Sequence, residues 1–257
     1  MEPFAISFSS PVGSAYLSRA ALPSLQYSSK RKISSSINKS AINMNLFSIT
    51  NILIAINCIV SFLAFSNSKI MNDLIMWPVV VKEKNQWYRF ISSGFLHADY
   101  MHLIFNMFTL FFFGRNLEMH FNYYGLGGNI AYLALYFIGL IVSDIPSYLK
   151  HKNDYHYRSL GASGAVSAVV FATIIFSPWS SIYLFGALKI SATVYAFLFI
   201  FYCIYMGKKG GDNINHDAHL WGAVFGLAFT LILIALLQPT LFSSIIEELS
   251  HPSLFGN

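Results

Sequence analysis

The chain has 257 residues, of which 55% are hydrophobic, 17% aromatic and only 11% charged. Soluble domains carry about a quarter charged residues, so this composition indicates a protein whose main solvent is lipid. The net charge of +5 is small and dispersed, and it forms no basic stripe of the kind that binds nucleic acid. Cys58 and Cys203 lie inside apolar runs, without a CxxC pair or a disulfide framework, so both are interpreted as small core residues.

Residues 1–43 differ in composition from the rest of the chain. They are rich in serine and contain five lysines and arginines but a single acid, Glu2. No apolar core follows the basic residues, so the segment resembles an organellar transit peptide more than a secretory signal. The alternatives are a disordered tail or an upstream extension of a gene that starts at Met44. We expect the folded domain at residues 44–240 and a short C-terminal tail at 241–257.

Six stretches after this segment approach the 20 or so apolar residues that cross a bilayer. They cover residues 46–65, 101–117, 129–144, 163–179, 191–206 and 216–237. The connection at 66–100 is amphipathic and carries tryptophan and tyrosine, as expected of a segment at the membrane interface. The sequence therefore predicts an all-α, polytopic membrane protein, a six-transmembrane-helix bundle in one domain.

The second, fourth and sixth predicted helices begin on the same side of the membrane. Nine lysines and arginines lie on that side, against Arg115 and Lys189 on the other when the N-terminal segment is left out. The positive-inside rule therefore favours a cytosolic or matrix location for the side on which these helices begin.

Ionisable residues within membrane spans are costly and mark candidate functional sites. Two histidines stand out, His102 in the first turn of the second helix and His219 in the first turn of the sixth. Ser163 opens the fourth helix. Because these three helices begin on the same side, their first turns lie at similar depth and the three side chains can converge.

Each of these residues has a chemical role to offer. A serine hydroxyl becomes an effective nucleophile beside a base, usually histidine, which makes Ser163 and His219 the candidate pair. Unpaired N–H groups at a helix start stabilise an oxyanion. His102 and Asn106 are spaced i, i+4, so they share a helix face and supply further donors.

Small residues predict that the fourth and sixth helices approach closely. Gly222 and Gly226 are spaced i, i+4 on the sixth helix, as are Gly164 and Ala168 on the fourth. Such pairs allow transmembrane backbones to meet. Gly161 permits the tight turn that leads into the fourth helix.

Each pattern has a simpler interpretation when taken alone. The sequence GxSG often marks only a contact between small residues, and Gly222 with Gly226 often marks only packing. His216, Asp217 and His219 suggest a metal site, but no second pair of ligands is evident in the sequence. We therefore expect neither a metal nor another cofactor.

Taken together, these residues resemble the rhomboid family of intramembrane serine proteases between Trp87 and Gly226. Tyr88-Arg89 resembles the family's Trp-Arg pair, and His97 to Asn106 resembles its histidine-rich start of the second helix. The remaining matches are Glu118 after that helix, Gly161-Ala162-Ser163-Gly164 for the GxSG motif, and Ala218-His219 with Gly222 and Gly226 for the AHxxGxxxG motif.

This resemblance implies a Ser163–His219 dyad that hydrolyses peptide bonds in or near transmembrane segments of membrane-anchored proteins. It assigns oxyanion stabilisation to His102 and Asn106, and structural roles to Arg89, Glu118, Gly161, Gly164, Gly222 and Gly226. The implied partners are substrate proteins and the lipid bilayer, in a bacterial inner membrane or an organellar membrane. For a bacterial membrane, the family's orientation is opposite to that favoured by the charge count.

Three positions depart from the family pattern, the first being Tyr88 in place of a tryptophan. Ser167, one turn after Ser163, replaces an aromatic ring that in the family packs against the catalytic histidine, and Phe171 replaces a usual glycine. Trp221 is one candidate to fill the volume that Ser167 leaves.

Two other classes of protein compete with the protease. The first is a catalytically inactive rhomboid-like protein that binds or escorts membrane proteins; such relatives typically lack the serine or the histidine. The second is a small transporter, which six helices without inverted repeats disfavour.

Overall fold

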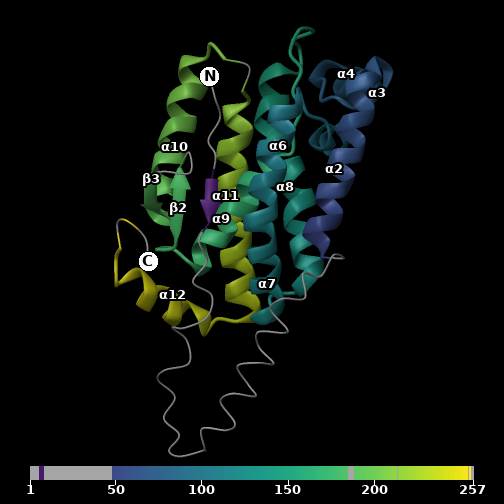
Figure 1. The fold of residues 1–257 in the computed structure, drawn as a ribbon. Helices are drawn as coiled ribbons and strands as arrows, with labels where there is room; N and C mark the ends of the chain where they lie inside the picture. The colour runs from purple at the N-terminus through teal and green to yellow at the C-terminus, as the bar shows by residue number, and fades with distance from the viewer. Residues whose placement is uncertain (1–5, 9–47, 185–187, 213, 254, 256–257) are drawn as a thin grey trace, which may run out of the picture.

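The structure is a computed structural model that describes residues 6–8, 48–184, 188–212, 214–253 and 255. Five long helical segments run roughly alongside one another (Figure 1). They are α2 (Ile49–Ser66), α8 (Gly128–His151), α9 (Ser163–Phe176), α10 (Ala192–Lys209) and α11 (His216–Leu237). By length and composition, α2, α8 and α11 are apolar enough to cross a membrane, and α9 is a shorter apolar helix. The prediction of a mostly helical membrane protein is confirmed.

The second predicted span is a continuous helical run with a change of pitch. It comprises α6 (Tyr100–Thr109), a π-helical turn η2 (Leu110–Gly114) and α7 (Arg115–Tyr123). Asp99 caps its start by accepting a hydrogen bond from the N–H of His102 at 2.8 Å. This cap fixes the first turn, which carries His102.

The amphipathic connection between α2 and α6 folds into four short helices near one end of the bundle (Figure 1). They are α3 (Ser68–Leu74), α4 (Pro78–Lys84), α5 (Arg89–Ser92) and the 3₁₀ turn η1 (Ser93–Phe95). Arg89 is only 4% exposed. Its guanidinium donates to the carbonyls of Asn72 and Ile75 at 2.9 and 2.6 Å. Arg89 therefore holds the connection together from within.

The all-α prediction missed a small antiparallel sheet. Strands β2 (Ser181–Leu184) and β3 (Leu188–Ser191) follow α9, and β1 (Ile6–Phe8) pairs with β2 on its other edge. The predicted fourth helix was also too long at its end, because Pro178 disfavours helical geometry at Ser177. Of residues 1–43, the structure describes only residues 6–8, so the expectation for this segment lies outside the described residues. The predicted C-terminal tail contains α12 (Leu241–Leu249).

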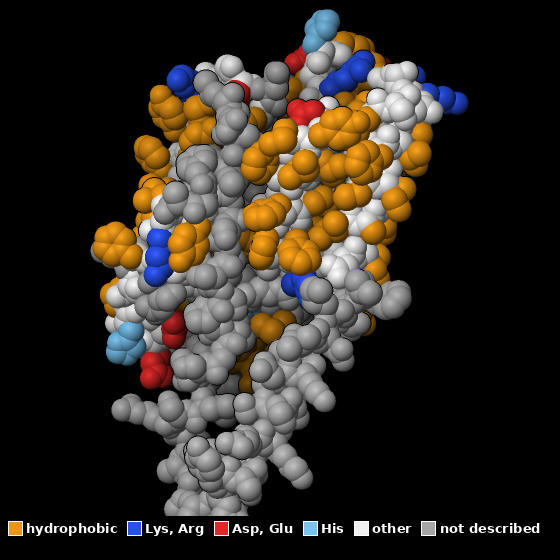
Figure 2. Space-filling view, in the orientation of Figure 1, with side chains coloured by type: hydrophobic (Ala, Val, Ile, Leu, Met, Phe, Trp, Pro, Cys, Tyr) orange, Lys and Arg blue, Asp and Glu red, His pale blue; other side chains and the backbone are white. Residues whose placement is uncertain are grey.

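The helix α9 occupies the centre of the bundle, and every residue from Gly164 to Ile175 is buried. It contacts α8, α11 and the α6–η2–α7 run, whose apolar side chains join it in one core cluster. Figure 2 shows a broad band of hydrophobic side chains across the middle of one face, with most of the visible charged side chains toward the two ends. That distribution matches an apolar slab with aqueous phases on both sides.

Candidate active site

Ser163 and His219 are in direct contact although 56 residues separate them in the chain. The Oγ of Ser163 lies 2.8 Å from Nε2 of His219, across the packed first turns of α9 and α11. The first hydrogen bond inside α9 runs from the N–H of Val166 to the carbonyl of Ala162 at 2.9 Å. The N–H groups of Ser163 and Gly164 therefore have no acceptor within the helix and face the turn that precedes it.

That turn depends on Gly161, whose φ of 124° is unfavourable for residues with a side chain. Its N–H donates to the carbonyl of Ser93 at 3.0 Å, which ties the turn to η1. A Cβ at Gly161 would lie 2.8 Å from Cε1 of His102. The imidazole of His102 therefore lies against the turn that presents Ser163.

Glycines bring the backbones of α9 and α11 together. A Cβ added at Gly222 would collide with the carbonyl oxygen of Gly164, and one at Gly226 would collide with that of Ala168. On its other side, Gly164 leaves no room for a Cβ beside Ser143 of α8. The contact between Ser163 and His219 thus depends on close backbone packing on both sides of Gly164.

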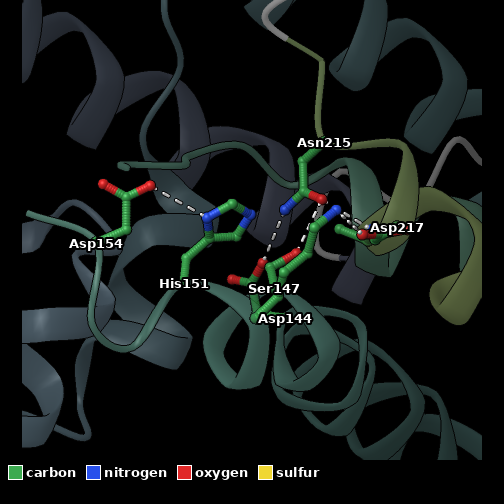
Figure 3. A network of polar contacts seen from close by, with 8 residues as sticks. Asp144, Ser147, His151, Asp154, Asn215 and Asp217 are labelled. Carbon is green, nitrogen blue, oxygen red and sulfur yellow. Dashed lines mark hydrogen bonds and ion pairs between the residues drawn. The ribbon is translucent and has the colours of Figure 1, made fainter. Parts of the chain in front are cut away.

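Asn215 is a residue of the site that the sequence analysis missed. It caps α11 by accepting from the N–H of Ala218 at 3.1 Å, and its Oδ1 also accepts from the hydroxyl of Ser147 at 2.9 Å. Figure 3 shows Asn215 pointing toward Ser147 and Asp144 of α8. The start of the helix that carries His219 is therefore anchored to α8. The sequence signal that could have identified Asn215 is the preference for asparagine at the position just before a helix.

The amide of Asn106 and the ring of His102 have distinct hydrogen bonds. Nδ1 of His102 accepts from the N–H of Ala98 at 3.3 Å, so the neutral ring carries its proton on Nε2. Nε2 and Cε1 are the ring atoms nearest to Gly161. Nδ2 of Asn106 donates one proton to the carbonyl of His102 at 3.0 Å, and its second proton remains for another acceptor.

His97 is a second residue that the sequence analysis did not place in the site. It is fully buried, and its ring meets that of His102 edge to face with centroids 5.0 Å apart. Ser61 donates its proton to the carbonyl of Phe95, so Nδ1 of His97 donates to Ser61 Oγ at 2.8 Å. Burial lowers the pKa of His97 to about 3, which keeps the ring neutral. Nothing in the sequence indicates that a histidine in this predicted connection is buried.

An aromatic ring does lie against His219, and it comes from α10. Phe199 stacks on the imidazole with ring centroids 6.2 Å apart and planes inclined by 24°. Trp221, the candidate from sequence, is 46% exposed and does not take this position. Ser167 is buried, and Phe171 one turn further along α9 contacts Phe199 at 5.5 Å between centroids.

Glu118 joins the second helical run to the start of the first long helix. Its carboxylate accepts from the N–H groups of Ile49 and Thr50 at 2.8 and 3.1 Å, and from the hydroxyl of Thr50 at 2.8 Å. A carboxylate at a helix N-terminus satisfies unpaired N–H groups and the helix dipole. Glu118 therefore ties the α6–η2–α7 run to the start of α2.

This fold and site define a class of protein: a multi-pass helical membrane protein with a hydrogen-bonded serine–histidine pair at the starts of two packed helices. Residues 84–236, more than half of the chain, match the Rhomboid domain family. The chain therefore belongs to the rhomboid family.

The chain is also similar to curated proteins from a plant and a bacterium. It is 27% identical over 166 residues to RHOMBOID-like protein 12, mitochondrial, of Arabidopsis thaliana, covering 61% of this chain and 49% of the relative. It is 32% identical over 182 residues to RHOMBOID-like protein 6, mitochondrial, of the same plant, covering 70% and 52%. It is 28% identical over 169 residues to Putative rhomboid protease YdcA of Bacillus subtilis (strain 168), covering 63% and 77%. The chain spans about half the length of the two plant relatives.

Proposed function

We propose that this protein is an intramembrane serine protease that hydrolyses peptide bonds in or near transmembrane segments of membrane-anchored proteins. The observation that carries the proposal is the 2.8 Å contact between Ser163 Oγ and His219 Nε2 at the start of a buried helix. A serine and a histidine in this relation form an activated nucleophile. Membership of the rhomboid family supports the same reaction class.

The proposed reaction proceeds in two steps. In the first, His219 Nε2 takes the proton of Ser163 as Oγ attacks the substrate carbonyl, and then delivers it to the leaving amine. In the second, His219 takes a proton from water, the resulting hydroxide attacks the acyl-serine ester, and the proton returns to Ser163 Oγ. The product is a carboxylic acid, and the dyad is regenerated.

The negative oxygen formed in each step needs hydrogen-bond donors. The N–H groups of Ser163 and Gly164 at the start of α9 are suited to this role. The imidazole of His102 lies against Gly161, and the second amide proton of Asn106, one turn further along the same helix, remains for an acceptor. We assign oxyanion stabilisation to all four groups.

The proposal extends to the membrane arrangement. We propose six crossings, by α2, the α6–η2–α7 run, α8, α9, α10 and α11, within a protease domain at residues 44–240 followed by a tail at 241–257. The bilayer is organellar or that of a bacterial inner membrane, and two of the plant relatives are named as mitochondrial. The connection between α10 and α11, with the positive φ values of Gly210 and Gly211, is suited to gate substrate access.

The alternative is a rhomboid-like protein that binds membrane proteins without cutting them. A binding role requires neither a nucleophile nor a base, and it does not explain why Ser163 and His219 meet at hydrogen-bonding distance. The short distance between Ser163 and His219 therefore favours the protease over the binding protein.

A fluorophosphonate probe separates these two functions in purified protein. We expect it to label the wild type, to fail with Ser163→Ala, and to label His219→Ala weakly while that variant remains folded. Ser243→Ala, in α12 and far along the chain from the dyad, is the control and keeps full labelling. Equal labelling of wild type, Ser163→Ala and His219→Ala would refute the dyad. Comparing membrane-protein fragments released in cells by wild type and Ser163→Ala then identifies substrates.

A further inference from the structure

Three side chains that could hold a metal ion meet at His219, the histidine of the serine–histidine pair. One ligand atom from each of Cys203, His216 and His219 lies within 4.8 Å of the other two. Cys203 comes from α10, whereas both histidines stand on the first turn of α11. Cys203 and His216 are almost fully buried, at 2% and 4% exposure. From the sequence no metal was expected, because no second pair of ligands was evident and Cys203 was interpreted as a core residue.

The hydrogen bonds of His216 leave one of its nitrogens ready for a metal. Its Nε2 lies 3.0 and 3.1 Å from the two carboxylate oxygens of Asp212. A carboxylate accepts, so in the neutral ring the proton stands on Nε2 and Nδ1 keeps its lone pair. Nδ1 is buried and has no hydrogen-bond partner among the described residues. Histidines that bind metals commonly donate their other N–H to a carboxylate in this way.

The chemistry and spacing of the donors favour zinc. Zinc is commonly bound by thiolate and imidazole ligands, whereas hard cations prefer oxygen ligands. With bonds of about 2.0–2.3 Å and tetrahedral angles, the ligand atoms of a zinc site lie about 3.5 Å apart. Zinc binding would draw the three ligand atoms, which lie within 4.8 Å of one another here, closer together.

We propose that Cys203, His216 and His219 form an inhibitory zinc site that switches off the proposed protease. Zinc binding by these residues requires no protease activity, so only the inhibitory effect of zinc rests on the proposed function. Zinc on Nδ1 of His219 forces the ring's proton onto Nε2, which then cannot accept the proton of Ser163. Zinc on Nε2 would displace the serine hydroxyl. Either ligation removes the base.

Binding is tested with Co²⁺, a spectroscopic substitute for zinc, on the purified full-length protein in detergent micelles. Wild type is expected to develop a thiolate-to-cobalt charge-transfer band that stoichiometric Zn²⁺ removes. Cys203→Ser is expected to lose the band, and His216→Gln to weaken binding at least tenfold. Asp212→Asn, which removes only the support of His216, is expected to weaken binding by about 10–100-fold. Cys58→Ser, the other cysteine of the chain, is the matched control and keeps the wild-type spectrum.

Inhibition is measured as the ratio of fluorophosphonate labelling with and without Zn²⁺, each variant being compared with itself. Wild type and Cys58→Ser are expected to be inhibited by Zn²⁺ and restored by EDTA, and Cys203→Ser to require at least tenfold more Zn²⁺. A wild type without the cobalt band, or a Cys203→Ser variant with an unchanged one, overturns the site. A cobalt band without Zn²⁺ inhibition of a labelled wild type overturns the regulatory role. A cobalt band in a protein that never labels, even in EDTA, retains the site and refutes the protease instead.

Discussion

Phe199 on α10 stacks against His219 on α11, with ring centroids 6.2 Å apart and planes inclined by 24°. The same ring contacts Phe171 of α9 at 5.5 Å, so it lies between the helix that carries the serine and the helix that carries the base. A planar neighbour restricts the rotation of an imidazole and keeps Nε2 directed at Ser163. In this chain the ring comes from α10, whereas the family pattern places it on the helix of the nucleophile.

Phe199→Ala is therefore expected to lower kcat of the proposed protease by about 10–100-fold, because a misplaced base loses its alignment with the nucleophile. Cleavage of a transmembrane model substrate in detergent measures kcat and KM separately. Phe197→Ala is the matched control, since Phe197 is on the same helix but 73% exposed. Similar kcat values for Phe197→Ala and Phe199→Ala would show that the stacked ring does not position His219.

Ser167→Tyr is expected to lower stability by about 1–3 kcal/mol without raising kcat, because Ser167 is buried and Phe199 already supplies the ring. Thermal unfolding in detergent measures the stability. The double variant Ser167→Tyr/Phe199→Ala returns the ring to α9 and is expected to recover part of the kcat lost in Phe199→Ala. A single Ser167→Tyr variant that gains turnover would mean that His219 is loosely held in the wild type.

Asn106→Ala is expected to lower kcat by about 10²–10³-fold with little change in KM, because in the proposed mechanism the amide stabilises charge only in the transition state. Asn122→Ala is a suitable control. Asn122 also donates from Nδ2 to the carbonyl four residues earlier, that of Glu118, at 2.7 Å. Loss of this local bond is expected to leave kcat unchanged. A rise in KM alone for Asn106→Ala would indicate substrate binding instead.

Gly222→Ala is expected to reduce both stability and fluorophosphonate labelling, because its Cβ would collide with the carbonyl oxygen of Gly164. Overpacking of this kind costs about 1–3 kcal/mol and separates the helices that hold the dyad. Gly207→Ala is the control, since a Cβ there meets Asp217 Oδ1 at an ordinary 3.4 Å. Wild-type stability and labelling in Gly222→Ala would show that close packing of α9 and α11 is unnecessary.

The sequence by itself determined the long helices and the pairing of small residues between two of them. Apolar length and proline positions are local properties, so the start of α11 at His216 was predicted correctly and the end of α9 was wrong by only a few residues. The motifs around Ser163 and His219 were equally readable, because each lies within a few consecutive residues.

Only the tertiary structure decided what surrounds the imidazole of His219. Phe199 and Cys203 belong to an apolar helix with little periodicity, and nothing in its sequence tells which residues face α11 rather than lipid. The pairing of β1 with β2 and the burial of His97 likewise depend on partners distant in the chain. Helix rotation about its own axis is set by packing, and in a membrane both lipid-facing and protein-facing surfaces are apolar, so the pattern that reveals a buried face in water is absent.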